Sequence, residues 1–363
     1  MSEIMSEVTD VFNKQRIDKT RYEALLKHFR LNITEKYVFP PEIVQVHGTT
    51  IATVGNFSAS TGKPKSKKTF NVSAIVAAAL SGKEVLRYKA ELPPDKQRIL
   101  YIDTEQSKYH CHKVLERVLK LADLPTDREC NRIDFFVLRE YSPSQRRDII
   151  NWALHEDRHY GLVIIDGIRD LIHDINNPSE ALDIINELMR WSSYYELHIH
   201  TVLHLNKGDD NTRGHLGTEL NNKAETILQV SKCIDNESVS EVKAMHIRDR
   251  EFAPFAFEVQ EDALPHLVEN HEFKAGKRER NAALTNLSDE LHRKALESAF
   301  EGVAAMGYQQ LTEAVRKGYE VIGYPRGRNS IVNQIKFLIR NGAIVKHDKQ
   351  YTYNRDFSIN SPV

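Results

Sequence analysis

The chain has 363 residues, of which 40% are hydrophobic and 28% charged, and its formal net charge is −1. That length suits two domains with a large core, and the near-neutral balance means that any contact with nucleic acid must use local basic patches. Three scattered cysteines argue against a disulfide framework and suit a reducing cytoplasm. We see no secretion signal and no apolar run near the roughly 18 residues that span a bilayer, so we expect a cytoplasmic protein with no membrane partner.

Segment 1–40 is polar, and its amphipathic pattern from Val8 to about Arg30 predicts one or two helices, which Pro40 and Pro41 end. From 41 to 268, short apolar runs alternate with helical patterns, which predicts an α/β core with a mainly parallel sheet. The expected buried strands are 50–54, 98–102, 133–138, 162–165 and 200–204, followed by antiparallel strands at 227–230, 242–247 and 255–259.

A lysine-rich stretch containing Gly55 and Gly62 follows the apolar run 49–54 and precedes a small-residue helix, 70–80, that Gly82 can end. A loop between a strand and a helix points main-chain N–H groups at an anion, and the helix N-terminus stabilises a phosphate. Lys68 can then reach the terminal phosphates of ATP, and the Thr69 hydroxyl can ligate Mg²⁺. The predicted nucleotide-binding residues are Gly62, Lys63, Pro64, Lys65, Ser66, Lys67, Lys68, Thr69 and Phe70.

Lys67 departs from the phosphate-loop pattern G-x-x-x-x-G-K-[ST], which has a glycine at that position. Gly62, Lys68 and Thr69 match the pattern. A lysine in a tight loop is expected to be strained by about 1–3 kcal/mol if its dihedral angles are unusual. The alternative interpretation is a basic surface loop with no ligand.

Acidic residues follow two of the expected strands. Glu105 comes just after Asp103 at the end of one strand, and Asp166 ends another. Carboxylates at the carboxyl ends of strands lie on the ligand-binding rim of an open α/β sheet, so Glu105 can orient or deprotonate the attacking water and Asp166 can hold Mg²⁺. Either can also be an ordinary strand-end residue.

Further polar groups extend this set. His204 ends a third strand and either senses the terminal phosphate or is a satisfied core histidine, and the loop 208–215 that follows is a candidate nucleic-acid contact or only a surface loop. Arg248 and Arg250 offer a cation that can stabilise phosphoryl transfer across a subunit boundary, although a solvated surface accounts for them equally well. Adjacent residues on a helix point in different directions, so we do not expect His110, Cys111 and His112 to bind zinc.

At these residues the chain resembles the RecA-fold ATPases, in particular the hexameric helicase group that includes the plasmid RepA helicases and is related to DnaB and KaiC. The resemblance covers residues 43–268. The sequence of the stretch 55–70 is similar to the corresponding stretch in a subgroup found on bacterial mobile elements. It implies a ring oligomer in which Lys68 grips phosphate, Thr69 and Asp166 serve Mg²⁺, and Glu105 is the catalytic carboxylate. Arg248 or Arg250 would act in the site of a neighbouring subunit.

The charged stretch 269–287 is predicted to be a linker, and 288–363 a separate helical domain. A helix at 308–317, a second at 331–341 and a β-hairpin at 343–353 together resemble a winged helix, in which the second helix enters the major groove of DNA. The same fold also serves as a protein-interaction module. The expected DNA contacts are Arg326, Arg328, Asn329, Asn333, Lys336, Lys346 and Lys349.

Two functions are compatible with these features. One is a DNA-associated ATPase that hydrolyses ATP at subunit interfaces, with helicase or helicase-like work in the replication or transfer of a mobile element. The other is a non-catalytic DNA-binding regulator that uses ATP only as a switch, which the lysine at position 67 motivates.

Overall fold

The computed structural model of the chain describes residue 23, residues 26–27, and the ranges 29–205, 214–233, 235–273 and 284–357. These residues belong to two compact units, Met1–His271 and Glu272–Val363, each with hydrophobic clusters of its own. Most of the N-terminal segment expected to be helical lies outside the described residues, as do residues 208–213 of the candidate loop 208–215, whose last two residues, Gly214 and His215, begin a helix. In the described part of the chain, no helix is long and apolar enough to cross a bilayer.

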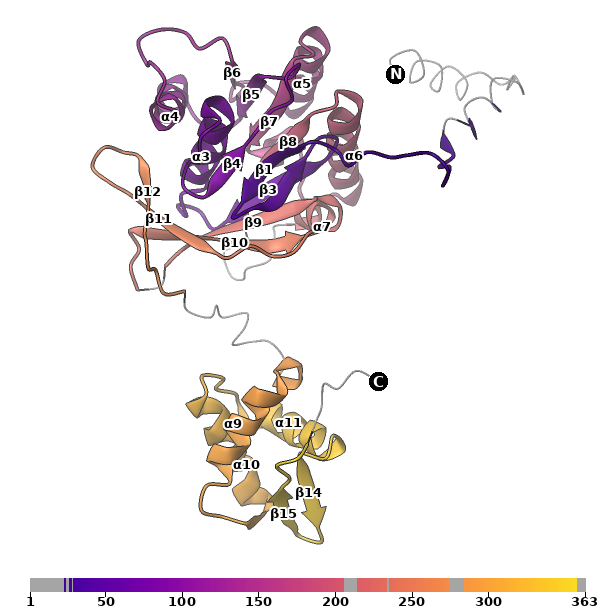
Figure 1. Ribbon diagram of the computed structural model, residues 1–363, viewed down its shortest axis with the longest axis vertical. Helices are drawn as coiled ribbons and strands as arrows, with labels where there is room; N and C mark the ends of the chain where they lie inside the picture. Colours follow the sequence, from indigo (N-terminus) through magenta and orange to yellow (C-terminus); the bar gives the residue numbers. More distant parts are fainter. Residues whose placement is uncertain are drawn as a thin grey trace. The chain divides into compact units, whose positions relative to one another are not determined.

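A nine-stranded sheet forms the centre of the first unit, in the order β12-β11-β10-β9-β3-β8-β7-β5-β6 (Figure 1). The six strands from β9 to β6 are parallel, and β10, β11 and β12 continue the sheet with antiparallel pairing. The strands are β3 (Phe57–Gly62), β5 (Arg98–Asp103), β6 (Ile133–Val137), β7 (Tyr160–Asp166), β8 (His198–His204), β9 (Thr226–Lys232), β10 (Val239–Ile247), β11 (Phe255–Val259) and β12 (Pro265–Leu267).

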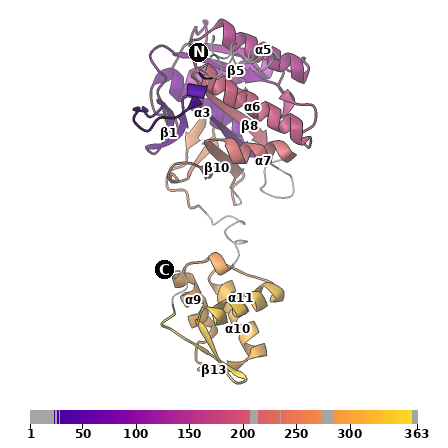
Figure 2. The same cartoon turned by 90° about the vertical axis from the view of Figure 1, so that its right-hand side faces the viewer.

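Helices cover both faces of this sheet (Figures 1 and 2). One face packs against α3 (Lys68–Ser81) and α4 (Lys108–Leu121), together with a small sheet of order β2-β1-β4. The other face packs against α5 (Pro143–Glu156), α6 (Pro178–Tyr194), α7 (Gly214–Lys223) and the short 3-10 helix η1 (Ile168–Leu171). The small sheet consists of β1 (Glu42–Val46), β2 (Thr49–Thr53) and β4 (Tyr88–Ala90). Because both faces are covered, strands such as β7 are buried at every residue.

Two expectations about strands are wrong. The apolar run 49–54 does not lead into the lysine-rich loop: it forms β2 of the small sheet, and the strand that does so is β3. The strand at 227–230, expected to be antiparallel, is part of β9 and pairs in parallel with β3. In both cases the position of the strand depends on the strand with which it pairs, and the sequence of one segment does not identify that second strand.

A buried polar network explains how β3, with the sequence Phe-Ser-Ala-Ser-Thr-Gly, lies in the middle of the sheet. Ser58 Oγ lies 2.7 Å from His198 Nε2 and 2.8 Å from His200 Nδ1, and Ser60 Oγ lies 2.9 Å from His200 Nε2. His198 Nδ1 is 2.8 Å from the carbonyl oxygen of Thr53. Burial lowers the pKa of both histidines, that of His200 to about 3, so both rings stay neutral.

Acid is therefore expected to destabilise the first unit through His200. Below about pH 6.5 the unfolded chain binds a proton at this ring, whereas the folded chain does not until about pH 3. The contribution of His200 to the free energy of unfolding should fall by about 1.4 kcal/mol per pH unit as the pH drops through this window. Urea denaturation at pH 7, 6 and 5 measures it. His200→Gln, which cannot titrate, should flatten the pH dependence, and an unchanged slope in that variant would contradict the assignment.

In its described residues, the second unit contains three α-helices, one short 3-10 helix and a three-stranded sheet of order β13-β15-β14. Its elements are η2 (Leu284–Asn286), α9 (Asp289–Ala299), β13 (Ala305–Gly307), α10 (Tyr308–Val321), α11 (Arg328–Arg340), β14 (Ile344–His347) and β15 (Gln350–Tyr353). Both α10 and α11 extend beyond the predicted helices, so Arg328 and Asn329 lie in the first turn of α11. Leu284 and Leu287, placed by sequence in the linker, are buried in the core of this unit.

Candidate nucleotide-binding site

The lysine-rich loop runs from Gly62 at the end of β3 to Lys68 at the start of α3. A Cβ atom at Gly62 would lie 2.2 Å from the carbonyl oxygen of Val230 and 2.5 Å from Ser66 Oγ. Only glycine therefore allows the loop to fold back this closely against β9. Close packing against β9 is thus the steric reason why the first position of the phosphate-loop pattern is glycine.

Lys67 has the left-handed backbone that the sequence pattern assigns to glycine, with φ 66° and ψ 33°. Its Nζ donates a hydrogen bond to the carbonyl oxygen of Ser238, in the turn between β9 and β10. Burial, with the nearby Lys232 charge, lowers the pKa of Lys67. The loop therefore keeps the glycine-type conformation although a lysine occupies the position.

Replacing Lys67 with glycine or with alanine separates strain from charge. Both variants lose the ammonium group and its contact with Ser238, but only glycine tolerates φ 66° without strain. We expect Lys67→Gly to be more stable than Lys67→Ala by about 1 kcal/mol. Chemical denaturation of the two variants measures this difference, and an alanine variant of equal or greater stability would show that the position is unstrained.

The Lys68 side chain folds back onto the start of the loop. Its Nζ donates to the carbonyl oxygens of Gly62 at 2.9 Å and Lys63 at 3.0 Å, and burial lowers its pKa to about 8. Ser66 Oγ is buried without a hydrogen-bond partner within the described residues, and no side chain caps the N-terminus of α3. A buried cation, an unpaired hydroxyl and an uncapped helix end fit a phosphate group.

A second set of groups fits a divalent cation. Thr69 Oγ1 donates to Asp166 Oδ2 at 3.1 Å, and the Tyr101 hydroxyl donates to the same oxygen at 3.0 Å. Burial, helped by Asp103, raises the pKa of Asp166 to about 6. A hydroxyl beside a buried carboxylate at the end of β7 is an oxygen donor pair of the kind that Mg²⁺ prefers.

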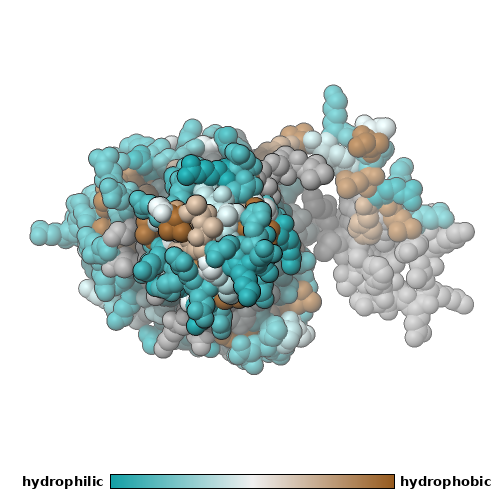
Figure 3. Space-filling model, turned by 90° about the horizontal axis from the view of Figure 1, so that it is seen from below, coloured by the Kyte–Doolittle hydropathy of each residue, from teal (hydrophilic) through white to brown (hydrophobic). Residues whose placement is uncertain are grey.

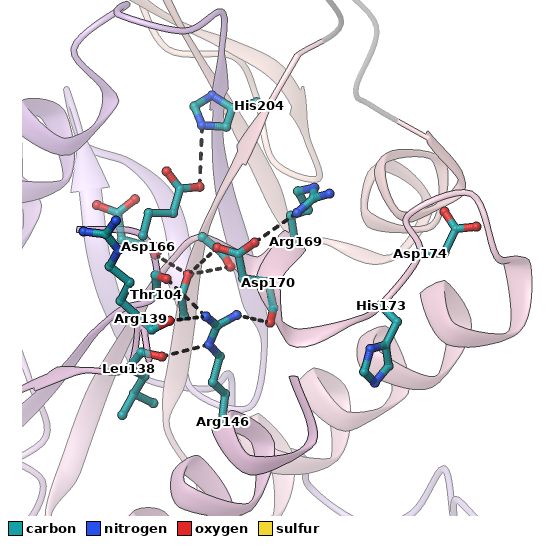
Figure 4. Close-up of polar contacts among 12 residues, drawn as sticks. Thr104, Leu138, Arg139, Arg146, Asp166, Arg169, Asp170, His173, Asp174 and His204 are labelled. Atoms are coloured by element: carbon teal, nitrogen blue, oxygen red, sulfur yellow. Dashed lines mark hydrogen bonds and ion pairs between the residues drawn. The ribbon is translucent and has the colours of Figure 1, made fainter. Parts of the chain in front are cut away.

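Glu105 lies on the turn after β5, and Asp103 shapes that turn. Asp103 Oδ1 accepts the backbone N–H groups of Glu105 at 2.9 Å and Gln106 at 2.7 Å. Glu105 Oε1 lies 3.7 Å from His204 Nε2, and this contact is the largest cause that lowers the pKa of Glu105 (Figure 4). The Glu105 carboxylate is therefore ionised and half-exposed beside the loop.

The buried Arg146 guanidinium holds this edge of the sheet together (Figure 4). It donates to carbonyl oxygens of Leu138 at 2.9 Å, Arg139 at 2.9 Å, Asp170 at 2.6 Å and Thr104 at 3.4 Å. It thus connects the ends of β5 and β6 with η1, the helix that follows Asp166. No motif around Arg146 indicates this role.

These groups surround a cavity of about 330 Å³. Among the predicted residues, Lys65, Lys67, Lys68, Thr69, Phe70, Glu105, Asp166 and His204 line it. Sequence reasoning did not assign its other lining residues, which are Asp103, Gln106, His110, Lys113, Val114, Arg117 and Val202. The Arg117 guanidinium lies 3.6 Å from the centre of the Phe70 ring, so this wall is aromatic and cationic.

Neither Arg248 nor Arg250 lines this cavity. Arg248 follows β10, and the last residue of β10, Ile247, pairs with Thr226, the first residue of β9. This is the amino end of β9, whereas Gly62 lies at the carboxyl end of the neighbouring β3. Along the strand direction, Arg248 and Gly62 are therefore roughly 15 Å apart. Arg248 also donates to the carbonyl oxygen of Lys223 at 3.1 Å.

The candidate DNA-contacting residues lie in the second unit, and all except the half-buried Arg326 are exposed. Asn329, Asn333, Lys336 and Arg340 recur at helical spacing along the exposed face of α11, opposite the buried Ile331, Ile335 and Leu338. Lys346 and Lys349 lie on the hairpin formed by β14 and β15.

One family model matches most of the first unit. Residues 36–210 match a family model described as an AAA domain. The matched range includes the lysine-rich loop, Glu105, Asp166 and His204. The crystal structure of the RadB recombinase is similar to this chain with 16% sequence identity and a TM-score of 0.42, over 60% of this chain and 93% of that one. No match was found among curated proteins.

Proposed function

We propose that the protein is a RecA-like, DNA-associated ATPase that hydrolyses ATP at interfaces between copies of the chain. The helicase or helicase-like work of a mobile element, in replication or transfer, is the specific role that we propose. One observation carries the ATPase part of the proposal: Lys68, Thr69, Asp166 and Glu105 converge on one cavity at the carboxyl ends of the parallel strands.

The residues divide the work as follows. Lys68, Ser66 and the N-terminus of α3 bind the phosphates, and Thr69 and Asp166 hold Mg²⁺. Bound ATP and Mg²⁺ supply the phosphoanhydride bond that is cleaved and the cation that neutralises its charge. Glu105 accepts a proton from the attacking water, and His204 keeps the Glu105 carboxylate ionised and in place.

Two features support assembly into an oligomer. Arg248 lies at the other end of the strands from the cavity and Arg250 does not line it, so a role of either arginine in hydrolysis would be in the site of a neighbour. The N-terminal segment also exposes apolar side chains (at the right of Figure 3), among them Leu31, Ile33 and Val38, which are 77%, 100% and 90% exposed. Apolar side chains gathered on a surface are typical of an interface.

The second unit supports contact with DNA. The helices α9, α10 and α11 and the β14–β15 hairpin follow one another as in a winged helix, and the exposed face of α11 carries Asn329, Asn333 and Lys336. Amide and ammonium groups on such a face are suited to base edges and phosphates. We propose that α11 enters the major groove while Lys346 and Lys349 contact the backbone.

Phosphate release without DNA, with single-stranded DNA and with duplex DNA tests the function. We expect DNA to stimulate hydrolysis, and Asp166→Ala to abolish it. Lys336→Ala should reduce the stimulation and leave basal hydrolysis unchanged, whereas Lys294→Ala, on α9, should change neither. Unchanged turnover in Asp166→Ala would rule out the assigned site.

A nucleotide-switched DNA-binding regulator is the second candidate. The left-handed Lys67, tied to the β9–β10 turn, is the observation that favours it, because release of this contact by a nucleotide would report occupancy to the rest of the sheet. This candidate predicts ATP binding with negligible hydrolysis, and an affinity for DNA that depends on the bound nucleotide. The same phosphate-release assay therefore separates the two functions.

A further inference from the structure

We propose that Cys233, Glu241 and His271 form a zinc site that is separate from the nucleotide site. The three residues offer one thiol sulfur, one carboxylate oxygen and one imidazole nitrogen, and these atoms all lie within 4.8 Å of one another. None of the three residues lines the cavity at the phosphate loop.

The site joins three segments of the chain. Cys233 follows β9, Glu241 lies in β10, and His271 follows β12 as the last residue of the first unit. Cys233 N–H donates to the carbonyl oxygen of Val239 at 2.9 Å, which fixes the cysteine beside the start of β10. His271 Nε2 lies 2.8 Å from Glu241 Oε1. One backbone hydrogen bond and one side-chain contact thus hold the donors close together before any ion binds.

The three side chains are largely shielded from water. Cys233 is 8% exposed and packs in a small apolar cluster with Val239, Ala256 and Val268. The side chains of His271 and Glu241 are 12% and 20% exposed. A metal site needs an apolar shell that limits competition from water, and these neighbours provide one.

The donor chemistry selects zinc. Thiolate and imidazole are poor ligands for Mg²⁺ and Ca²⁺ but good ones for Zn²⁺. Tetrahedral zinc places its ligand atoms about 3.5 Å apart, so a small side-chain movement from the present arrangement is enough. When the ion binds, the Cys233 thiol releases its proton to solvent, and the thiolate and carboxylate together balance the charge of Zn²⁺. Water completes the coordination.

A zinc ion here would fasten the segment after β12 to the β9–β10 pair. Lys67 contacts Ser238 in the turn between those two strands, so the ion would also stiffen the support of the phosphate loop. The effect of zinc on the fold, however, does not require nucleotide. The metal proposal and the nucleotide proposal can therefore fail independently.

Zinc content of the untagged full-length protein tests the proposal. After equilibration with Zn²⁺ and removal of excess, we expect one equivalent per chain by elemental analysis and native mass spectrometry. Cys233→Ser and His271→Ala should each weaken zinc binding by at least about 100-fold. Cys130→Ser and the double variant His110→Ala/His112→Ala should retain the ion, and so should Lys68→Ala.

Cobalt keeps the test decisive even if a variant fails to fold. Co²⁺ added to the folded wild type should give the near-ultraviolet charge-transfer absorption of a cobalt–thiolate bond, and Zn²⁺ should displace it. A folded wild type that retains no zinc and shows no such band would overturn the proposal. Equal zinc retention by a folded Cys233→Ser variant would do the same.

Discussion

Replacing Lys68 with alanine is expected to reduce ATP hydrolysis by at least about 100-fold, since one buried donor to a developing charge contributes on the order of 10²–10³ in rate. The Lys68 ammonium is buried and bound only to the carbonyl oxygens of Gly62 and Lys63 among the hydrogen bonds of the described loop, so it can turn to a phosphate without breaking a core contact. Affinity for ATP should fall as well, because no second ammonium is buried in this loop. Steady-state phosphate release and equilibrium binding of a fluorescent ATP analogue measure the two effects.

Lys63→Ala is the matched control for this prediction. Lys63 belongs to the same loop and carries the same charge, but its side chain is exposed and does not line the cavity. We expect Lys63→Ala to keep most of the activity, because an exposed charge is screened by water and salt. Equal losses in the two variants would mean that the loop acts only through its net charge.

Glu105→Gln is expected to abolish hydrolysis while leaving ATP binding intact. An amide has the shape of the carboxylate but cannot accept the proton of the attacking water, and general-base catalysis contributes about 10²–10⁴ in rate. The Glu105 side chain is 46% exposed, so the substitution should not disturb the core. Single-turnover hydrolysis, measured beside equilibrium ATP binding, separates the two effects. Glu140→Gln, at an exposed position after β6, is the control and should behave as the wild type.

The pH dependence of hydrolysis adds a second reading of Glu105. Because His204 is the largest cause that lowers the Glu105 pKa, His204→Asn should raise that pKa. Activity requires the ionised carboxylate, so the fall in rate on acidification should begin at a higher pH in His204→Asn than in the wild type. An unchanged pH profile in His204→Asn would show that His204 does not control the pKa of Glu105. Wild-type turnover in Glu105→Gln would refute the assigned carboxylate itself.

The candidate site could be predicted from sequence where the signal is local. Gly62, Lys68 and Thr69 lie in one short loop, and Asp166 directly follows an apolar run, so spacing alone was enough to single them out. The strand that carries the loop could not be predicted in the same way. Ser58 and Ser60 are polar, yet they are buried because His198 and His200 of β8, far along the chain, pair with them. Thr61 is buried as well, and its hydroxyl donates to the carbonyl oxygen of Leu228 at 3.2 Å.

Supporting residues could not be predicted either, because their partners come from distant segments. Arg146 lies on α5 and donates hydrogen bonds to carbonyl oxygens of four other residues. No sequence motif around Arg146 predicts these contacts. The left-handed backbone of Lys67, in contrast, followed from the glycine that the pattern places there. Its direction toward Ser238 depended on how the β9–β10 turn packs.

A crystal structure with a non-hydrolysable ATP analogue and Mg²⁺ tests the central claim most directly. We predict the triphosphate in the loop between Gly62 and Thr69, with Lys68 Nζ turned from the loop carbonyl oxygens to the phosphates, and Mg²⁺ beside Thr69 and Asp166. A loop that stays closed and empty at saturating nucleotide, or a nucleotide bound elsewhere on the chain, would contradict the account.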